Sequence, residues 1–158
     1  MSDSKASVVI VDDEEMVLTA LRALLELETE HDVHTFTDPT QAARFVESTQ
    51  VDVCVSDYLM PGMNGIQFLT HTKQLQPEAS RVLLTGHADK QSAIAAINQA
   101  ALFQYVEKPW DNAQLLLVIQ SGAERAKLFR TLQSKISELD SAHSSLKDVQ
   151  RRLLKAFM

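Results

Sequence analysis

Five side chains able to take part in acid, base or phosphoryl chemistry each follow a short apolar run of the sequence: Asp12, Asp13, Asp57, Thr85 and Lys108. If these positions meet in one cleft, the three carboxylates repel one another and raise one another's pKa unless a cation neutralises them. Oxygen ligands of this kind suit Mg²⁺, which prefers one or two carboxylates together with waters and a phosphate oxygen. The residue types therefore predict a magnesium site that also receives a phosphoryl group.

The lysine and the threonine fit the same chemistry. The ammonium of Lys108 and the hydroxyl of Thr85 can contact the outer oxygens of a phosphoryl group, while Asp57 can serve as its covalent acceptor. We favour Asp57 over the other acids because it follows the central predicted strand. The turn sequence Met-Pro-Gly at 60–62 then holds the following backbone close to the site.

The elements that must position these residues are visible as alternating hydrophobic patterns. Residues 7–11 (SVVIV) are a β-branched run typical of a buried parallel strand, and residues 14–27 then carry apolar side chains at helical spacing. The alternation repeats, with further strands predicted at 32–36, 51–56, 81–84 and 103–106, and helices at 39–47, 65–74, 90–100 and from 111 onward. Five strands alternating with five helices predict an α/β fold, a doubly wound five-stranded parallel sheet of (βα)5 type.

This fold places the reactive residues at one edge. In doubly wound sheets, ligands bind beyond the carboxyl ends of the strands, where the strand order reverses. All the predicted strands but the second end next to a reactive or ionic residue. A single Asp after a strand is more often a turn residue or a helix cap. Reactive or ionic residues at the ends of four strands together favour a functional site.

Four motifs in this order resemble the receiver domain of two-component response regulators over about residues 6–123. They are Val-Asp-Asp-Glu at 11–14, Ser-Asp-Tyr-Leu-Met-Pro-Gly-Met-Asn-Gly at 56–65, Leu-Thr-Gly at 84–86 and Val-Glu-Lys-Pro-Trp at 106–110. The resemblance implies a flavodoxin-like sheet. It also implies a response regulator of a two-component phosphorelay, whose partner is a histidine kinase or phosphotransfer protein.

The resemblance assigns a role to each site residue. It implies that Asp57 accepts the phosphoryl group and that Lys108 pairs with a phosphoryl oxygen. It implies that Asp12 and Asp13 position Mg²⁺, with Asp13 as the more direct ligand, and that the backbone carbonyl of Leu59 completes the protein's share.

By the same resemblance, Thr85 and Tyr105 form a switch pair. The Thr85 hydroxyl moves toward the phosphoryl group, and Tyr105 turns into the space that it leaves. The bond between Lys108 and Pro109 is expected to be cis. Because Gly86 leaves the acceptor open to water, we expect a short-lived phosphoryl group. An aromatic residue on an edge strand is the alternative explanation for Tyr105.

The C-terminal part has a different composition. Residues 1–123 hold 7 Lys and Arg against 17 Asp and Glu, whereas residues 124–158 hold 8 against 4, and all Gly and Pro lie between 39 and 122. Apolar residues here recur at alternating steps of three and four, which predicts a coiled-coil helix continuing from the last helix of the sheet domain. Its predicted seam is Leu132, Ile136, Leu139, His143, Leu146, Gln150 and Leu153.

A parallel homodimer is the preferred interpretation of this seam. His143 and Gln150 occupy a positions, where polar residues lower stability but fix register and oligomer number. A helix folded back on the globular part, or one frayed in isolation, stays open as an alternative. Basic residues are scattered along the helix without an aromatic or helix-turn-helix pattern, so nucleic-acid binding by this chain is not expected.

Length and composition fit one receiver domain, residues 1–123, followed by a helical linker and dimerisation segment, residues 124–158. We expect a longer protein whose output domain, for example a cyclic-di-GMP phosphodiesterase or another signalling enzyme, is absent from this chain. The lone Cys54, the lack of a leader and the lack of a long apolar segment indicate a cytoplasmic protein without membrane contact. We interpret Cys54 as a buried, inert thiol, and His31 and His34 as solvated residues rather than metal ligands.

Two other function classes remain open from sequence. One is a Mg²⁺-dependent phosphohydrolase that uses Asp57 as a nucleophile, although the adjacent Asp12 and Asp13 lack the Asp-x-Asp spacing that such hydrolases have. The other is a coiled-coil adaptor that acts without phosphate.

Overall fold

The computed structural model of the protein describes residues 5–157, except for the side chains of His87, Lys90, Ala95, Ala96 and Phe157. All the predicted strands and helices are present, with small shifts at their ends, and a short 3-10 helix that the sequence did not predict precedes the fourth α-helix. In chain order the elements are β1 (Ser7–Val11), α1 (Glu15–Glu28), β2 (Asp32–Phe36), α2 (Pro39–Ser48), β3 (Val53–Asp57), α3 (Gly65–Leu75), β4 (Ser80–Thr85), η2 (His87–Asp89), α4 (Lys90–Ala100), β5 (Gln104–Glu107) and α5 (Asn112–Phe157).

The five strands form one sheet in the order β2-β1-β3-β4-β5, and every neighbouring pair is parallel. The direction of winding reverses between β1 and β3, because the chain first adds β2 on one side and then β3, β4 and β5 on the other. The predicted flavodoxin-like fold is therefore confirmed. The carboxyl ends of β1 and β3 flank the point of reversal, where such sheets bind ligands.

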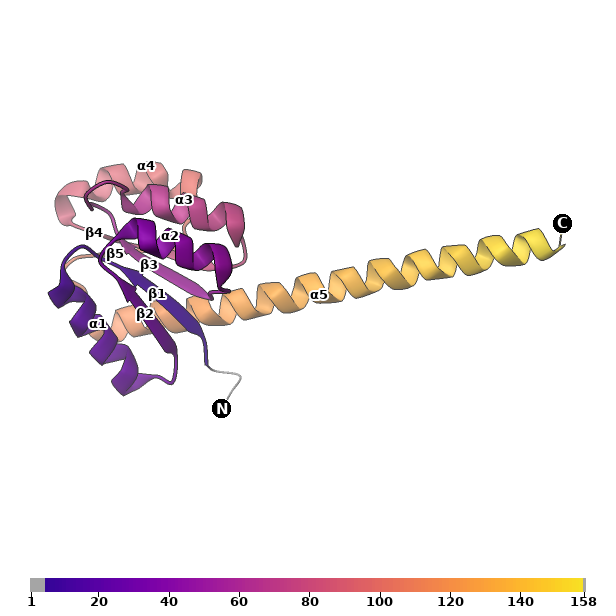
Figure 1. Ribbon diagram of the computed structural model, residues 1–158, viewed down its shortest axis with the longest axis horizontal. Coiled ribbons are helices and arrows are strands. Elements are labelled where there is room, and N and C mark those ends of the chain that lie inside the picture. The colour runs from indigo at the N-terminus through magenta and orange to yellow at the C-terminus, as the bar shows by residue number, and fades with distance from the viewer. Residues whose placement is uncertain (1–4, 158) are drawn as a thin grey trace. The chain divides into compact units, whose positions relative to one another are not determined.

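Helices cover both faces of the sheet, as Figure 1 shows, and each face has its own apolar core. On one face, α1 and the first part of α5 pack over alternate strand residues such as Val8 and Val55. On the other, α2, α3 and α4 pack over the intervening residues, among them Val9 and Cys54. Burial on both faces explains why the strands are nearly continuous apolar runs. Cys54 is fully buried, as predicted, and burial raises its pKa to about 12.

Local sequence signals fix the helix that follows the third strand. Asn64 caps α3 by accepting a hydrogen bond from the backbone N–H of Gln67, whose side chain accepts one from Asn64 N–H in return. The first helical residue is Gly65, and a β-carbon there would collide with the backbone carbonyl oxygen of Asp57. Glycine thus lets α3 start directly against the end of β3, which holds the loop between them in place.

One sequence interpretation is wrong. His31 was expected to be solvated, but the structure buries it, and its Nδ1 accepts a hydrogen bond from Ala6 N–H at 3.0 Å. Its Nε2 lies 2.9 Å from Gln120 Oε1 on α5, so the ring that accepts at Nδ1 donates at Nε2. His34 is partly buried, with its ring 4.7 Å from that of Phe45. Both side chains contribute to packing.

The chain separates into two compact units after Ala126. The first contains the sheet and its helices, and the second is a helical segment that begins at Lys127 and is called the tail below. None of the helices in residues 5–157 combines the length and apolar character needed to span a bilayer.

Candidate functional site

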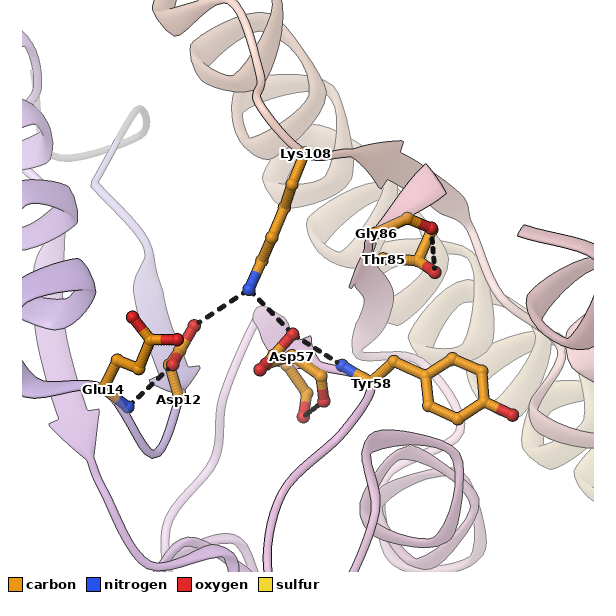
Figure 2. A network of polar contacts seen from close by, with 8 residues as sticks. Asp12, Glu14, Asp57, Tyr58, Thr85, Gly86 and Lys108 are labelled. Atoms are coloured by element: carbon orange, nitrogen blue, oxygen red, sulfur yellow. Dashed lines mark hydrogen bonds and ion pairs between the residues drawn. The ribbon is translucent and has the colours of Figure 1, made fainter. Parts of the chain in front are cut away.

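The carboxyl edge of the sheet brings the predicted site residues together. Asp12 follows β1, Asp57 ends β3, Thr85 ends β4 and Lys108 follows β5. Figure 2 shows the ammonium of Lys108 between Asp12 and Asp57, in contact with a carboxylate on either side. The four positions come from neighbouring parts of the parallel sheet, so the strand order itself explains their convergence.

Three carboxylates form a cluster at this edge. Oxygen atoms of Asp12, Asp13 and Asp57 all lie within 4.8 Å of one another, with Asp12 and Asp57 buried and Asp13 exposed. Asp12 Oδ1 accepts a hydrogen bond from Glu14 N–H at 2.9 Å. Its other oxygen, Oδ2, is buried, yet no hydrogen-bond donor in the described part of the chain reaches it. An oxygen-only cluster with such an oxygen fits a hard divalent cation such as Mg²⁺.

The electrostatics of Asp12 point the same way. Burial is the largest influence and raises the pKa of Asp12, and the negative charges of Asp57 and Asp13 raise it further. The hydrogen bond from Glu14 N–H and the charge of Lys108 lower that pKa but do not offset the burial. The ionised form of Asp12 is thus disfavoured in the protein alone, and a bound cation would stabilise it.

Lys108 neutralises part of this charge. Its Nζ lies 2.9 Å from Asp57 Oδ1 and 3.6 Å from Asp12 Oδ2. Burial lowers the pKa of Lys108, but the hydrogen bond to Asp57 and the charges of Asp57, Asp12 and Glu14 outweigh burial and raise it overall. The backbone supports this placement, because Lys108 N–H donates to Thr85 O at 2.8 Å and extends the pairing of β4 with β5. The peptide bond that follows, to Pro109, is cis, as the resemblance implied.

Asp57 is held rigidly but stays partly accessible. Its Oδ1 accepts hydrogen bonds from Lys108 and from Tyr58 N–H, the latter at 3.0 Å. Its side chain keeps 11% of its surface exposed, so a small phosphoryl donor can reach it. The loop beyond it is tied by a hydrogen bond of 2.8 Å from Gly65 N–H to Tyr58 O. This loop carries Leu59, whose side chain is exposed. The expected metal contact of the Leu59 carbonyl stays a prediction.

Thr85 and Tyr105 lie on neighbouring strands. Thr85 is buried, and its hydroxyl donates to Gly86 O at 3.3 Å, a long bond that gives little stabilisation. Tyr105 is half-buried on β5, where it pairs with Leu83 and packs against the core on the α4 side of the sheet. A surface pocket of about 490 Å³ is lined by residues 104–110 and Gln114, so open space adjoins this part of β5.

Sequence reasoning missed the contribution of Glu14. Its backbone N–H orients Asp12, and its carboxylate helps to raise the pKa of Lys108. The signal was available, because an Asp side chain in a loop commonly accepts a hydrogen bond from the backbone N–H two positions on.

The predicted seam residues all lie in the tail and none is buried. The exposed fractions of Leu132, Ile136, Leu139, Leu146 and Leu153 are 56, 50, 69, 63 and 54%. His143 and Gln150 are also exposed. At least half of each of these apolar side chains is therefore in contact with water in the single chain.

Comparison with known proteins decides the family. The family described as the response regulator receiver domain matches residues 8–120. The chain belongs to this family. Receiver domains generally bind Mg²⁺ through acidic residues and interact with histidine kinases or phosphotransfer proteins.

Individual relatives agree with this receiver assignment. The hydrogenase transcriptional regulatory protein HoxA of Cupriavidus necator is 34% identical over 124 residues, which are 78% of this chain and 25% of HoxA. The response regulator protein TodT of Pseudomonas putida is 27% identical over 155 residues, 98% of this chain and 67% of TodT. The HoxA and PgtA relatives are much longer proteins, of which this receiver chain spans only about a quarter to a third.

A solved structure shows the same fold. The signal receiver domain of an HD domain-containing protein from Pseudomonas fluorescens Pf-5 has a TM-score of 0.73 and 32% identity, covering 78% of this chain and 98% of that one. The receiver fold of this protein is therefore supported by sequence and by three-dimensional similarity together.

Proposed function

We propose that this receiver domain is switched by phosphorylation of Asp57, with the phosphoryl group supplied by the phosphohistidine of a kinase or phosphotransfer protein. The observation that carries the proposal is the position of Asp57, which lies 2.9 Å from the Lys108 ammonium and within an acidic cluster that can hold a divalent cation. Asp57 is also the one carboxylate at this edge that ends the central strand of the sheet.

In the proposed transfer, a carboxylate oxygen of Asp57 attacks phosphorus, the bond from phosphorus to the imidazole nitrogen breaks, and the imidazole leaves with the electron pair. Lys108 stabilises the charge that develops on a phosphoryl oxygen, moving from its present contact with Asp57 Oδ1. Asp12, Asp13, Asp57 and the Leu59 carbonyl would hold Mg²⁺, which supplies further charge stabilisation when bound.

The proposed switch uses Thr85 and Tyr105. The Thr85 hydroxyl makes only a weak hydrogen bond to Gly86 O, so it is available to a phosphoryl oxygen. Rotation of the hydroxyl toward the site would leave space near β5, and Tyr105, now half-buried beside open space, would turn inward. The face formed by α4, β5 and α5 would change as a result.

We further propose that residues 1–123 act as the receiver domain and that residues 124–158 form a linker that dimerises and relays the change to an output module. The exposed apolar stripe of the tail supports the homodimer. A cytoplasmic location is part of the proposal, since the only thiol, on Cys54, is buried and cannot form a disulfide within the chain.

Acetyl phosphate provides the test of the receiver mechanism. With Mg²⁺ present, the protein should accumulate one labile phosphoryl group, seen by intact mass, and EDTA should prevent this. Asp57→Asn should remove the modification entirely.

Asp52→Asn is the matched control, because Asp52 is another buried acid, just before β3, and an amide oxygen can replace Oδ2 in accepting from Ser7 N–H. It should be modified normally. Sustained turnover of phosphate esters without an accumulated phosphoprotein would favour a hydrolase instead. A folded protein that does neither would favour an adaptor.

A further inference from the structure

A surface pocket of about 350 Å³ lies where β2 ends, and it is called the β2 pocket below. Three elements line it: α1 contributes Glu15, Leu18, Thr19 and Arg22, the end of β2 contributes residues 35–37, and α2 contributes Gln41. None of these residues belongs to the phosphoryl site. Clefts of this size beyond the carboxyl ends of parallel strands are common places for small ligands. The β2 pocket is therefore a second candidate binding site at this edge of the sheet.

One face of α1 sets the order of charged and apolar groups along the pocket. Glu15, Leu18 and Arg22 are separated by steps of three and four residues, so they lie along a single stripe of the helix. The backbones of Glu15 and Arg22 are about 10 Å apart along the helix axis, and Leu18 lies between them. Leu18 is buried and Phe36 is partly buried. The pocket thus presents a negative end, an apolar middle and a positive end.

The guanidinium at the positive end is held by contacts on both terminal nitrogens. One nitrogen of Arg22 donates to Thr35 Oγ1 at 3.0 Å, and the other donates to Glu26 Oε1 at 3.3 Å. These contacts use two of the five N–H donors of the group, so others can bind a carboxylate. The pair with Glu26 is exposed, contributes little and can be exchanged for a ligand. Arg22 is therefore oriented in advance for an anionic group.

Two hydroxyls extend the polarity of the two ends. Thr19 Oγ1 donates to the backbone carbonyl of Glu15 at 3.0 Å, so its lone pairs can accept a hydrogen bond from a ligand. Thr35 Oγ1 accepts from Arg22, so its own hydrogen can be donated to a ligand. An ammonium near Glu15 would find a second acceptor, and a carboxylate near Arg22 would find a second donor.

The charges of the pocket select the class of ligand. A phosphate or a dicarboxylate would be repelled by Glu15, and a diamine would be repelled by Arg22. A molecule that carries an ammonium at one end, a carboxylate at the other and methylene groups between them matches all three parts of the pocket.

We propose that the β2 pocket binds a small zwitterion of the ω-amino acid class. The carboxylate of the ligand binds Arg22 and Thr35, its ammonium binds Glu15, and its methylene chain lies over Leu18 and Phe36.

Three probes with the same five-carbon chain test the proposal: 5-aminopentanoate, pentanoate and pentylamine. The full chain should bind 5-aminopentanoate with a dissociation constant on the order of 1 mM, as expected for a probe this small. Its affinity should exceed those of the other two probes by about 10-fold or more, because each of them lacks one charge-assisted contact. NMR titration measures the three affinities, and the backbone amides of residues 35–37 should shift. Equal affinities, or no binding of 5-aminopentanoate at about 10 mM, would overturn the proposal.

Substitutions at the two ends test the direction in which the ligand lies. Arg22→Met keeps the apolar stem of the side chain and should remove the preference for 5-aminopentanoate over pentylamine. Glu15→Gln should remove its preference over pentanoate. Each variant should weaken binding of 5-aminopentanoate by about 10-fold.

The matched controls are Arg44→Met and Glu28→Gln, at exposed positions of α2 and α1 that lie outside the lining of the pocket. Both should bind all three probes as the unaltered protein does. If Arg22→Met and Glu15→Gln instead weaken binding of the three probes equally, charge recognition is excluded and the proposal fails. All titrations are made without acetyl phosphate and Mg²⁺, so failure of the phosphorylation proposal would not affect them.

Discussion

Polar side chains are buried both at the amino edge of the sheet, where the strands begin, and at the carboxyl edge, where they end. They differ in how many of their hydrogen bonds are made. At the amino edge, Gln76 is fully used: its Oε1 accepts from Val51 N–H, and its Nε2 donates to the carbonyls of Val46 and Thr49. At the carboxyl edge, Asp12 Oδ2 is buried without a donor. The contrast holds for these two side chains rather than for every group at each edge, because the Ser7 hydroxyl at the start of β1 is also buried without a hydrogen bond to any described residue. Gln76 stabilises the fold through bonds that are all made, whereas Asp12 Oδ2, with the Lys108 ammonium 3.6 Å away, has room for a bound cation.

Arg81 gives the largest expected effect at the amino edge. Its guanidinium is buried and donates to the carbonyls of Ala100 and Ala101 at the end of α4 and to those of Pro77 and Ala79 in the loop before β4. Arg81→Met should lower the free energy of unfolding by about 3 kcal/mol, because several buried carbonyls lose a charged donor. Urea unfolding measures this loss, and phosphorylation should persist wherever the variant is folded.

The control for Arg81 is Arg22→Met. Arg22 is half-exposed, with 41% of its side-chain surface accessible, and its polar contacts within the described chain are with Glu26 and the hydroxyl of Thr35, so its removal should change stability by less than about 1 kcal/mol. Equal losses of stability in the two variants, or loss of phosphorylation in a folded Arg81→Met protein, would contradict the structural role assigned to the amino edge.

Asp12→Asn should change stability in the opposite direction. The ionised form of Asp12 is disfavoured by burial and by the charges of Asp57 and Asp13, so replacing this carboxylate should raise the free energy of unfolding by about 1–2 kcal/mol in EDTA, the size of a single stabilising substitution. Mg²⁺ affinity should fall at least 10-fold, by analogy with other metal-site changes. Calorimetry with and without Mg²⁺ measures both effects.

The pH dependence of that gain follows from the direction of the pKa shift. Because the pKa of Asp12 is raised in the folded state, ionisation destabilises the fold at neutral pH, and this cost disappears as pH falls through the raised pKa toward the ordinary value. The advantage of Asp12→Asn should therefore be largest at neutral pH and shrink on acidification. A constant advantage at all pH values would contradict this electrostatic explanation.

Ser80→Ala should cost about 1 kcal/mol. The Ser80 hydroxyl, at the start of β4, donates to Gly122 O on α5 at 2.7 Å in a buried setting. Phosphorylation should be unchanged, as expected for the amino edge. Ser48→Ala, at an exposed hydroxyl, serves as the control and should be silent. A Ser80→Ala protein of unaltered stability would remove this residue from the structural group.

Thr85→Ala should have the smallest effect on stability among the buried sites, about 0.8 kcal/mol, which comes from the loss of a buried methyl group, because its long hydroxyl bond stabilises little. Its effect should appear only after phosphorylation. The chain has two tyrosines, so fluorotyrosine NMR gives two signals, and Tyr58→Phe assigns them. The Tyr105 signal should shift on phosphorylation of the unaltered protein but not of Thr85→Ala. If the Tyr105 signal still shifts when Thr85→Ala is phosphorylated, the two residues are not coupled in the switch.

Sequence patterns predicted which strand ends meet at the carboxyl edge, because strand periodicity and strand order together determine this, but they missed the contribution of Glu14. They failed at the amino edge, where His31 was assigned to solvent. Its partners Ala6 and Gln120 lie 25 and 89 residues away in the chain, so no local pattern indicates them. Arg81 escaped notice for the same reason, since its acceptors are carbonyls that only the packing of α4 brings within reach.

The tail differs again. Its heptad spacing is readable in one chain, and a single copy leaves the seam exposed as expected for an unpaired helix. Its boundary, its dimerisation and the metal contact of Leu59 stay predictions, because each depends on a partner or an ion rather than on contacts within the chain.

The most direct test of the account is to locate the phosphoryl group. Reduction with borohydride converts an aspartyl phosphate to homoserine, and peptide mass mapping then identifies the position. After treatment with acetyl phosphate and Mg²⁺, we expect homoserine at position 57 alone, and none without Mg²⁺. Homoserine at position 12 or 13, or unmodified Asp57 in a folded protein with Mg²⁺ bound, would contradict the assignment of Asp57 as the phosphoacceptor.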